Sequence, residues 1–217
     1  MILFLTFSCS SAGVSNACAN TYINYETQTQ LKLPFDDEWF VFLKGRGVAE
    51  NYRAIHRVQR FALDFVQKKN GRTHSGNGLK NEDYYCFGKL INAPDDGIIV
   101  EVIDDIHDNV PGQFNRSIPT GNLVVIDHEN GEFSLLAHLK KDTIIVGVGD
   151  VVVKGQALGK TGNSGNSSEP HLHYHLQNTV DPFNGEGLPA KFQNYYVNNV
   201  LIERGEPMQN EYVNNDN

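Results

Sequence analysis

The sequence contains few cysteines and no concentration of positive charge. Only Cys9, Cys18 and Cys86 occur among its 217 residues, and Cys86 alone would remain if the first 19 residues were removed. An internal disulfide and a zinc site built on thiolates are then excluded, so any metal must be held by histidine and carboxylate. Lysine and arginine total 18 against 26 acidic residues, without any basic run. Nucleic acid is therefore not an expected partner.

Amphipathic segments of helix length are also absent. Short apolar runs alternate instead with turn residues, which is typical of an all-β domain. The Asn130-Gly131 pair favours a tight hairpin between two of the runs. We predict strands over Trp39–Leu43, Arg60–Val66, Ile98–Ile103, Leu123–Asp127, Glu132–His138, Thr143–Val146, Ala157–Thr161 and His171–Gln177.

The first 19 residues have the pattern of an export signal. An apolar run follows Met1, and Ala17-Cys18-Ala19 suits cleavage after Ala19. We therefore expect an exported protein, periplasmic or extracellular, with no transmembrane segment beyond the signal. Two alternatives remain open: Cys9 or Cys18 carries a lipid anchor to the membrane, or the segment is a buried first strand.

The length allows one core of ordinary size. We predict a polar linker over 20–32, a single catalytic domain over 33–196 and a C-terminal tail over 197–217. The loops Asn70–Lys89 and Asp104–Pro119 are long for a compact domain, and such loops are usually functional. We interpret them as walls of a substrate groove; the alternative is that they are surface insertions.

Three histidines alternate along one predicted strand. His171, His173 and His175 are separated by single residues, so their imidazoles share one face of a sheet. Burying them is costly unless a metal ion or hydrogen bonds satisfy them. The alternative is an exposed polar face on an edge strand.

Two more polar residues interrupt apolar runs. Asp64 lies among aromatic residues, where a carboxylate needs a metal ion or a cation, and Arg60 is the alternative partner. His138 ends an apolar strand and, taken alone, would more often be an ordinary hydrogen-bonded histidine.

Together these segments resemble the lysostaphin-type, or LytM-type, zinc metallopeptidases, which cut peptides of bacterial peptidoglycan. The resemblance covers roughly Leu33 to Tyr196. It implies a mostly antiparallel, barrel-sandwich-like catalytic domain with long loops. The order and spacing of the motifs carry it: Ala62-Leu63-Asp64-Phe65, the turn Ala93–Gly97, Leu136-Ala137-His138-Leu139, Val148–Gln156, Gly162-Asn163-Ser164-Gly165 and Pro170–Tyr174.

The resemblance also implies roles for individual residues. Asp64 and His173 would bind Zn²⁺, whereas His138 and His171 would act in catalysis without binding the ion. His175 falls where relatives often carry glutamate, and we assign it no direct contact with the ion.

The third metal ligand departs from the family pattern. It is usually a histidine four residues before the aspartate, and Arg60 stands at that place. Some relatives carry this histidine further upstream, near the position of Arg53. We expect His56 to be the third ligand; the alternative is that there is none.

The resemblance thus implies a zinc-dependent endopeptidase that hydrolyses peptide bonds in cell-wall peptidoglycan with metal-activated water. The main alternative is a catalytically inactive module that binds or activates other cell-wall hydrolases. A metal-storage or metal-transfer protein would leave Asp64 and His138 unexplained. The sequence does not indicate which bond is cut or the oligomeric state.

Overall fold

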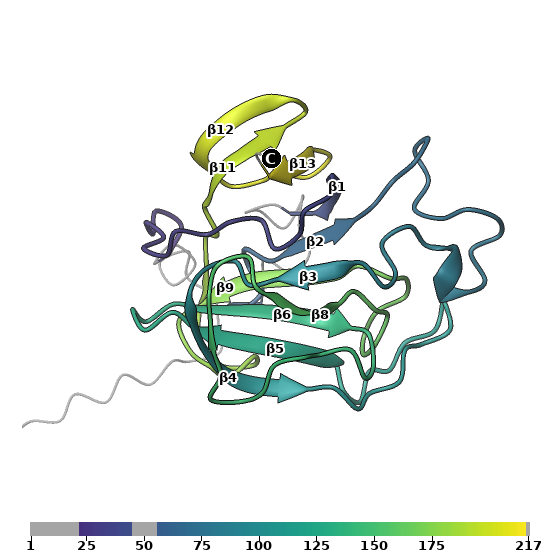
Figure 1. The fold of residues 1–217 in the computed structure, drawn as a ribbon, viewed down its shortest axis with the longest axis horizontal. Coiled ribbons are helices and arrows are strands. Elements are labelled where there is room, and N and C mark those ends of the chain that lie inside the picture. Colours follow the sequence, from purple (N-terminus) through teal and green to yellow (C-terminus); the bar gives the residue numbers. More distant parts are fainter. Residues whose placement is uncertain (1–21, 45–55, 216–217) are drawn as a thin grey trace, which may run out of the picture.

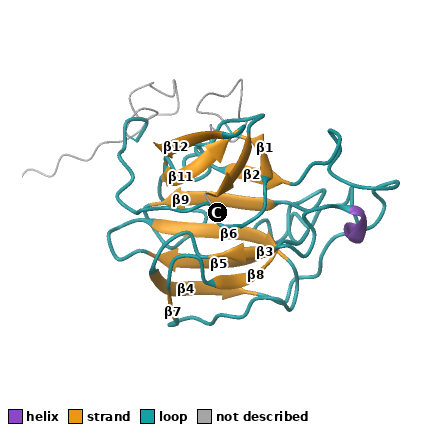
Figure 2. Cartoon of the chain, turned by 45° about the horizontal axis from the view of Figure 1, so that its top comes forward, coloured by secondary structure: helices purple, strands orange, loops and turns teal. Residues whose placement is uncertain are grey.

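The computed structural model describes residues 22–44 and 56–215. The predicted signal segment with Cys9 and Cys18, and also Arg53, lie outside the described residues. Within the described part of the chain, strands and loops account for nearly everything, and the one helical element is the 3-10 turn η3 (Asn81–Asp83), as Figure 2 shows. The prediction of an all-β fold is confirmed.

The strands form one large antiparallel sheet and one small one. The large sheet has the order β12-β11-β13-β1-β2-β9-β6-β5-β4-β7, with β10 also paired to β9, and β3 pairs with β8. The bounds are β1 (Trp39–Leu43), β2 (Leu63–Val66), β3 (Leu90–Asn92), β4 (Gly97–Ile103), β5 (Asn122–Asp127), β6 (Phe133–Leu139), β7 (Val151–Val152), β8 (Ala157–Lys160), β9 (Leu172–Gln177), β10 (Gly187–Leu188), β11 (Phe192–Val197), β12 (Val200–Gly205) and β13 (Tyr212–Asn215).

The main core lies on one face of the large sheet. Leu136 of β6 and Tyr174 of β9 belong to the same buried cluster as Ile91 of β3 and Leu158 of β8. The small sheet therefore covers this face, and Figure 1 shows it lying across the central strands. Odd-numbered residues of β6, such as Leu135 and Ala137, form a second, smaller cluster on the opposite face. The candidate site residues described below gather on that opposite face.

The hairpin prediction is confirmed, but one predicted strand is wrong. β5 and β6 are antiparallel neighbours, and their turn uses positive φ at Glu129 (58°) and Gly131 (83°). Thr143–Val146 is not a strand. The carboxylate of Asp104 accepts the backbone N–H groups of Thr143 and Ile144 at 3.3 and 3.1 Å, so these donors bond to a side chain instead of a neighbouring strand.

The folded unit is longer at both ends than predicted. The segment expected to be a tail from residue 197 onward forms β12 and β13, and β13 pairs with both β1 and β11. Asn215 is buried and donates from Nδ2 to the carbonyl of Leu33 at 3.1 Å. Within the expected linker, Leu31 is fully buried in the core. The boundaries at 33 and 196 therefore do not mark the ends of the sheet domain.

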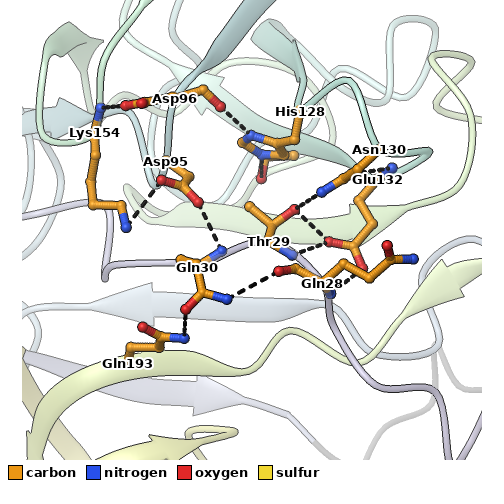
Figure 3. Close-up of polar contacts among 11 residues, drawn as sticks. Gln28, Thr29, Gln30, Asp95, Asp96, His128, Asn130, Glu132, Lys154 and Gln193 are labelled. Carbon is orange, nitrogen blue, oxygen red and sulfur yellow. Dashed lines mark hydrogen bonds and ion pairs between the residues drawn. The ribbon is translucent and has the colours of Figure 1, made fainter.

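One buried carboxylate fixes the N-terminal segment to the β5–β6 hairpin (Figure 3). Glu132 is fully buried. Its Oε2 accepts the backbone N–H of Thr29 at 2.8 Å and the Thr29 hydroxyl at 2.5 Å. Its Oε1 accepts the backbone N–H of Gln28 at 2.7 Å and the hydroxyl of Tyr25 at 2.8 Å. A carboxylate that accepts this many hydrogen bonds compensates for its burial.

We predict that Glu132→Gln lowers the free energy of unfolding by about 2–4 kcal/mol, because an amide carries no charge and turns an NH₂ group toward these donors. Urea denaturation followed by the fluorescence of Trp39, the only tryptophan, measures the change. Glu129→Gln is the matched control, since Glu129 is exposed on the same hairpin, and it should stay within about 0.5 kcal/mol. Equal losses in both variants would contradict the role given to Glu132.

Candidate functional site

The centre of the site is a cross-strand pair. In the antiparallel β2–β9 ladder, Asp64 lies directly opposite His173, and β6 places Ala137 on the other side of His173. Asp64 Oδ1 lies 2.8 Å from His173 Nδ1, and each residue is only 4% exposed. Leu63 and Phe65 point into the main core, so alternation turns Asp64 to the other face. The register therefore brings together the two predicted metal ligands.

His171 enters the site from the residue before β9. Its Nδ1 donates to the carbonyl of Glu169 at 2.9 Å, and the Ser167 hydroxyl lies 3.1 Å from the same nitrogen. Nε2 consequently faces the site, 3.7 Å from Asp64 Oδ1, and is buried without a hydrogen-bond partner among the described residues. An imidazole held in this way presents a lone pair to whatever enters the site.

Cys86 supports this corner and takes no part in the chemistry. Its thiol is fully buried and contacts the carbonyl of Pro170 at 3.1 Å. Burial raises the pKa of Cys86 to about 12, so the thiol stays protonated at neutral pH. Neither a metal thiolate nor a nucleophile is available from this residue.

His138 reaches the site through a bulge. Simple alternation along β6 would place it on the same face as Leu136, which lies in the main core. The β5–β6 register shifts at this point, and His138 adopts a positive φ of 62°, which is uncommon for a non-glycine residue. Its ring centroid then lies 4.7 Å from that of His171 and 5.6 Å from that of His173.

The Gly162–Gly165 motif holds His138 in this orientation. The Ser164 carbonyl accepts the Nδ1–H of His138 at 2.8 Å, which directs Nε2 to the site. Gly121 packs so closely that a Cβ there would lie 2.5 Å from Ser164. Gly165 has a φ of +77°, and a Cβ on it would lie 2.3 Å from the Gly121 nitrogen. Two glycines are therefore needed for the contact that aims His138.

The polar row of β9 continues past His173. His173 Nε2 lies 3.1 Å from His175 Nδ1, and His175 Nε2 lies 2.7 Å from Gln177 Oε1. His175 is 1% exposed and Gln177 is fully buried. In the sequence-based prediction, His175 makes no direct contact with the ion and Gln177 only ends the predicted strand, although the same two-residue alternation marks both.

His56, the expected third ligand, is not brought to the Asp64–His173 pair. It is exposed and lines a separate hollow with Arg57, Gln59 and Pro182. Gln59 and Pro182 also line the pocket that contains His138 and His173, so the two hollows adjoin.

Arg60, at the place of the usual family ligand, is buried with Nη1 3.9 Å from Glu186 Oε2. Glu186 also forms an ion pair with Arg57. The segment that leads into β2 is thus held against the residue that precedes β10.

A groove of about 430 Å³ leads away from the site. Asp64 and His171, which are both buried, line it together with the polar residues Ser167, Ser168 and Glu169. The apolar side includes two half-exposed aromatic residues, Phe42 and Phe114.

One of the two long loops lines this groove, and the other contacts one of its lining residues. Phe114 belongs to the loop Asp104–Pro119. Thr73, from the loop Asn70–Lys89, donates to Glu169 at 3.3 Å. The position of Phe114 agrees with the prediction that Asp104–Pro119 forms a wall of the groove, whereas Asn70–Lys89 contributes no lining residue to it.

The donor chemistry fits zinc, although the described residues supply only part of a site. Asp64 offers a carboxylate oxygen and His173 an imidazole nitrogen, both of which zinc commonly binds. Within 22–44 and 56–215, no group of three or more histidine, cysteine, aspartate or glutamate side chains is arranged to hold a metal ion. Over the same ranges, no helix is long and apolar enough to span a membrane.

Comparison with known proteins gives a family match. Residues 74–185, slightly more than half of the chain, match Peptidase family M23. The matched range includes His138, His171 and His173 and begins after His56 and Asp64.

Two curated relatives and one solved structure illustrate the similarity. An uncharacterized metalloprotease of Buchnera aphidicola is 36% identical over 128 residues, which cover 53% of this chain and 34% of that protein. Peptidoglycan DD-endopeptidase ShyC of Vibrio cholerae is 27% identical over 209 residues, covering 88% of this chain and 43% of ShyC. The chain spans less than half the length of these relatives. The structure of lysostaphin from Staphylococcus simulans aligns at 17% identity, covering 74% of this chain and 52% of that chain, with a TM-score of 0.42.

We predict that His56→Ala weakens zinc binding by roughly 10-fold or more, because catalytic zinc usually has three protein ligands. Competition with a chromophoric zinc chelator measures the dissociation constant. The matched control is His107→Ala, an exposed histidine that does not line the two adjoining hollows. Zinc binding unchanged in His56→Ala would remove His56 from the ligand set.

Proposed function

The chain belongs to peptidase family M23, and from this premise we propose that it is a zinc-dependent endopeptidase acting on peptide bonds of bacterial cell-wall peptidoglycan. One observation carries the proposal: Asp64, His173, His171 and His138 converge on one face of the sheet. The name of the relative ShyC supports the substrate class. Because peptidoglycan lies outside the cytoplasmic membrane, we also propose an exported location, periplasmic or extracellular.

Asp64 and His173 would hold the zinc ion, with His56 proposed as the third ligand. When bound, zinc supplies Lewis acidity, which lowers the pKa of a coordinated water toward roughly 7. Burial of Asp64 and His173 to 4% exposure keeps competing bulk water away from the pair. Among the residues that the structure describes, Cys86 is the only cysteine, and it offers no competing thiolate because it is buried and protonated.

His138 and His171 carry the proton transfers. Each donates its Nδ1–H to a backbone carbonyl, that of Ser164 for His138 and that of Glu169 for His171. Each therefore directs Nε2 toward the site, where it can accept a proton or, once protonated, donate a hydrogen bond to the substrate carbonyl oxygen. We assign general acid–base catalysis and stabilisation of negative charge on that oxygen to these two residues.

The groove supports a peptide as substrate. Its aromatic side, with Phe42 and Phe114, offers apolar contacts to a peptide chain. Ser167 and Ser168 on the polar side offer hydrogen-bonding groups, and Glu169 adds a negative charge. A peptide lying in the groove would come near His171, which lines it.

A second candidate function is a catalytically inactive module that binds or activates other cell-wall hydrolases. The placement of Arg60 beside Glu186 favours it, because the usual ligand position then holds a cation. Digestion of purified peptidoglycan by the zinc-loaded protein separates the two functions. Release of peptide fragments supports the endopeptidase, and binding without release supports the module.

We predict that His171→Ala and His138→Ala each retain zinc and lower turnover roughly 10²–10³-fold, because each removes a proton-transfer or charge-stabilising group. Zinc content and peptidoglycan cleavage are measured on the same preparations. Asp64→Ala is the matched comparison and should lose zinc together with activity. Loss of zinc from the His171→Ala or His138→Ala protein would contradict the division of roles.

We predict that Phe114→Ala raises KM roughly 10-fold with little change in kcat, since an aromatic wall contributes to peptide binding away from the reacting bond. Steady-state cleavage of a peptidoglycan fragment measures both constants. Leu201→Ala is the control, because Leu201 is equally exposed, at 48%, on β12. A fall in kcat with unchanged KM would count against the groove as the substrate path.

A further inference from the structure

The inference concerns the buried polar row beyond His173 and rests on the metal site proposed above. His173, His175 and Gln177 occupy alternate positions of β9 and share one sheet face. They form a continuous hydrogen-bonded row that begins at Asp64. Such a row is costly to bury, so each of its hydrogens must have a defined place.

The orientation of Gln177 determines the row. Its Nε2 group donates to the carbonyl of Thr179 at 2.6 Å and lies 3.3 and 3.4 Å from the carbonyls of Val180 and Asp181. An amide oxygen placed there would face three acceptors, so the NH₂ group must occupy this side. Oε1 therefore points to His175 Nε2, at 2.7 Å.

The orientation of Gln177 then determines which ring nitrogens of His175 and His173 carry hydrogens. Since Gln177 Oε1 can only accept, His175 carries its hydrogen on Nε2. A neutral imidazole with hydrogen on Nε2 has a lone pair on Nδ1, and this lone pair faces His173 Nε2 at 3.1 Å. His173 therefore carries a hydrogen on Nε2. Its Nδ1 lies 2.8 Å from Asp64 Oδ1.

Two lone pairs at this separation repel each other, so either a proton or a metal ion must lie between the two atoms. We propose that His175 and Gln177 are positioning residues that hold the hydrogen of His173 on Nε2, so that Nδ1 is the atom that binds the metal. Their effect reaches the ion only through His173. Hydrogen-bond partners of this kind orient a ligating histidine and strengthen it as a donor.

Replacement of His175 by residues with and without an acceptor tests the proposal. His175→Phe keeps a ring of similar size without an acceptor and should weaken zinc binding about 10- to 100-fold. His175→Glu supplies a carboxylate that accepts the same N–H and should stay within about threefold of wild type. The zinc dissociation constant is measured by chelator competition at one pH.

His128→Phe is the matched control, because His128 is a partly buried histidine with both nitrogens hydrogen-bonded, to the Asp96 carbonyl and to Ser134. The zinc affinity of the His128→Phe protein should equal that of the wild type. Long-range ¹⁵N–¹H spectra of the zinc-loaded wild type should place the hydrogens of His173 and His175 on Nε2. A structural role for His175 alone would not produce this spectroscopic pattern or the rescue by glutamate.

The outcomes separate this inference from the proposed function. If the wild type binds zinc and His175→Phe binds it equally well, or the spectra place the His173 hydrogen on Nδ1, the positioning role is overturned and the metal site stands. If the wild type binds no zinc, both are overturned. Should His175→Phe fail to fold, Gln177→Met provides the second variant, with an expected loss of about 3- to 10-fold in zinc affinity.

Discussion

The β2–β9 register is the constraint on which the site depends. Because side chains alternate along a strand, a slip of one residue would turn His173 into the core and Leu172 out of it. Burial of Leu63, Phe65, Leu172 and Tyr174 on the core face opposes such a slip. The apolar face thus supplies the free energy that keeps Asp64 and His173 paired on the other face. The same two strands therefore contribute to the core with one face and to the candidate site with the other.

The position of His138 depends instead on a strained backbone conformation. Its backbone adopts a conformation that costs of order 1–3 kcal/mol for a non-glycine residue. The surrounding structure sustains this cost: the His138 backbone N–H bonds to Thr120, and its ring bonds to Ser164. Beyond the bulge, Leu139 returns to the main core. Strain placed at one residue of a regular strand, beside two other histidines, is consistent with a catalytic role.

The sequence predicted the features that depend on local periodicity. The shared face of His171, His173 and His175 follows from alternation, and the β5–β6 hairpin follows from Asn130-Gly131. The aim of His138 could not be predicted, because its bulge depends on pairing with β5 and on Gly121.

The ends of the domain were misjudged for a related reason. Polar residues such as Thr29 and Asn215 look solvent-exposed in the sequence and are buried only through partners more than 100 residues away. Local composition contains no signal for such contacts.

The choice between an enzyme and an inactive module depends on the segment that leads into β2. Lys44, the residue after β1, is buried, and its ammonium group bonds to the Phe61 carbonyl at 3.1 Å and to Glu206 at 3.0 Å. The side chain of Lys44 therefore holds the chain just after β1 to Phe61, shortly before β2. On the return, Gly187 packs so closely on Val58 that a Cβ would lie 2.3 Å from its carbonyl oxygen. If this segment supplies a third ligand, as proposed for His56, its ordering would cost less than that of a free loop, because Val58 and Phe61 are held in place. The histidines of β9 are common to both functions, and the segment before Asp64 decides between them.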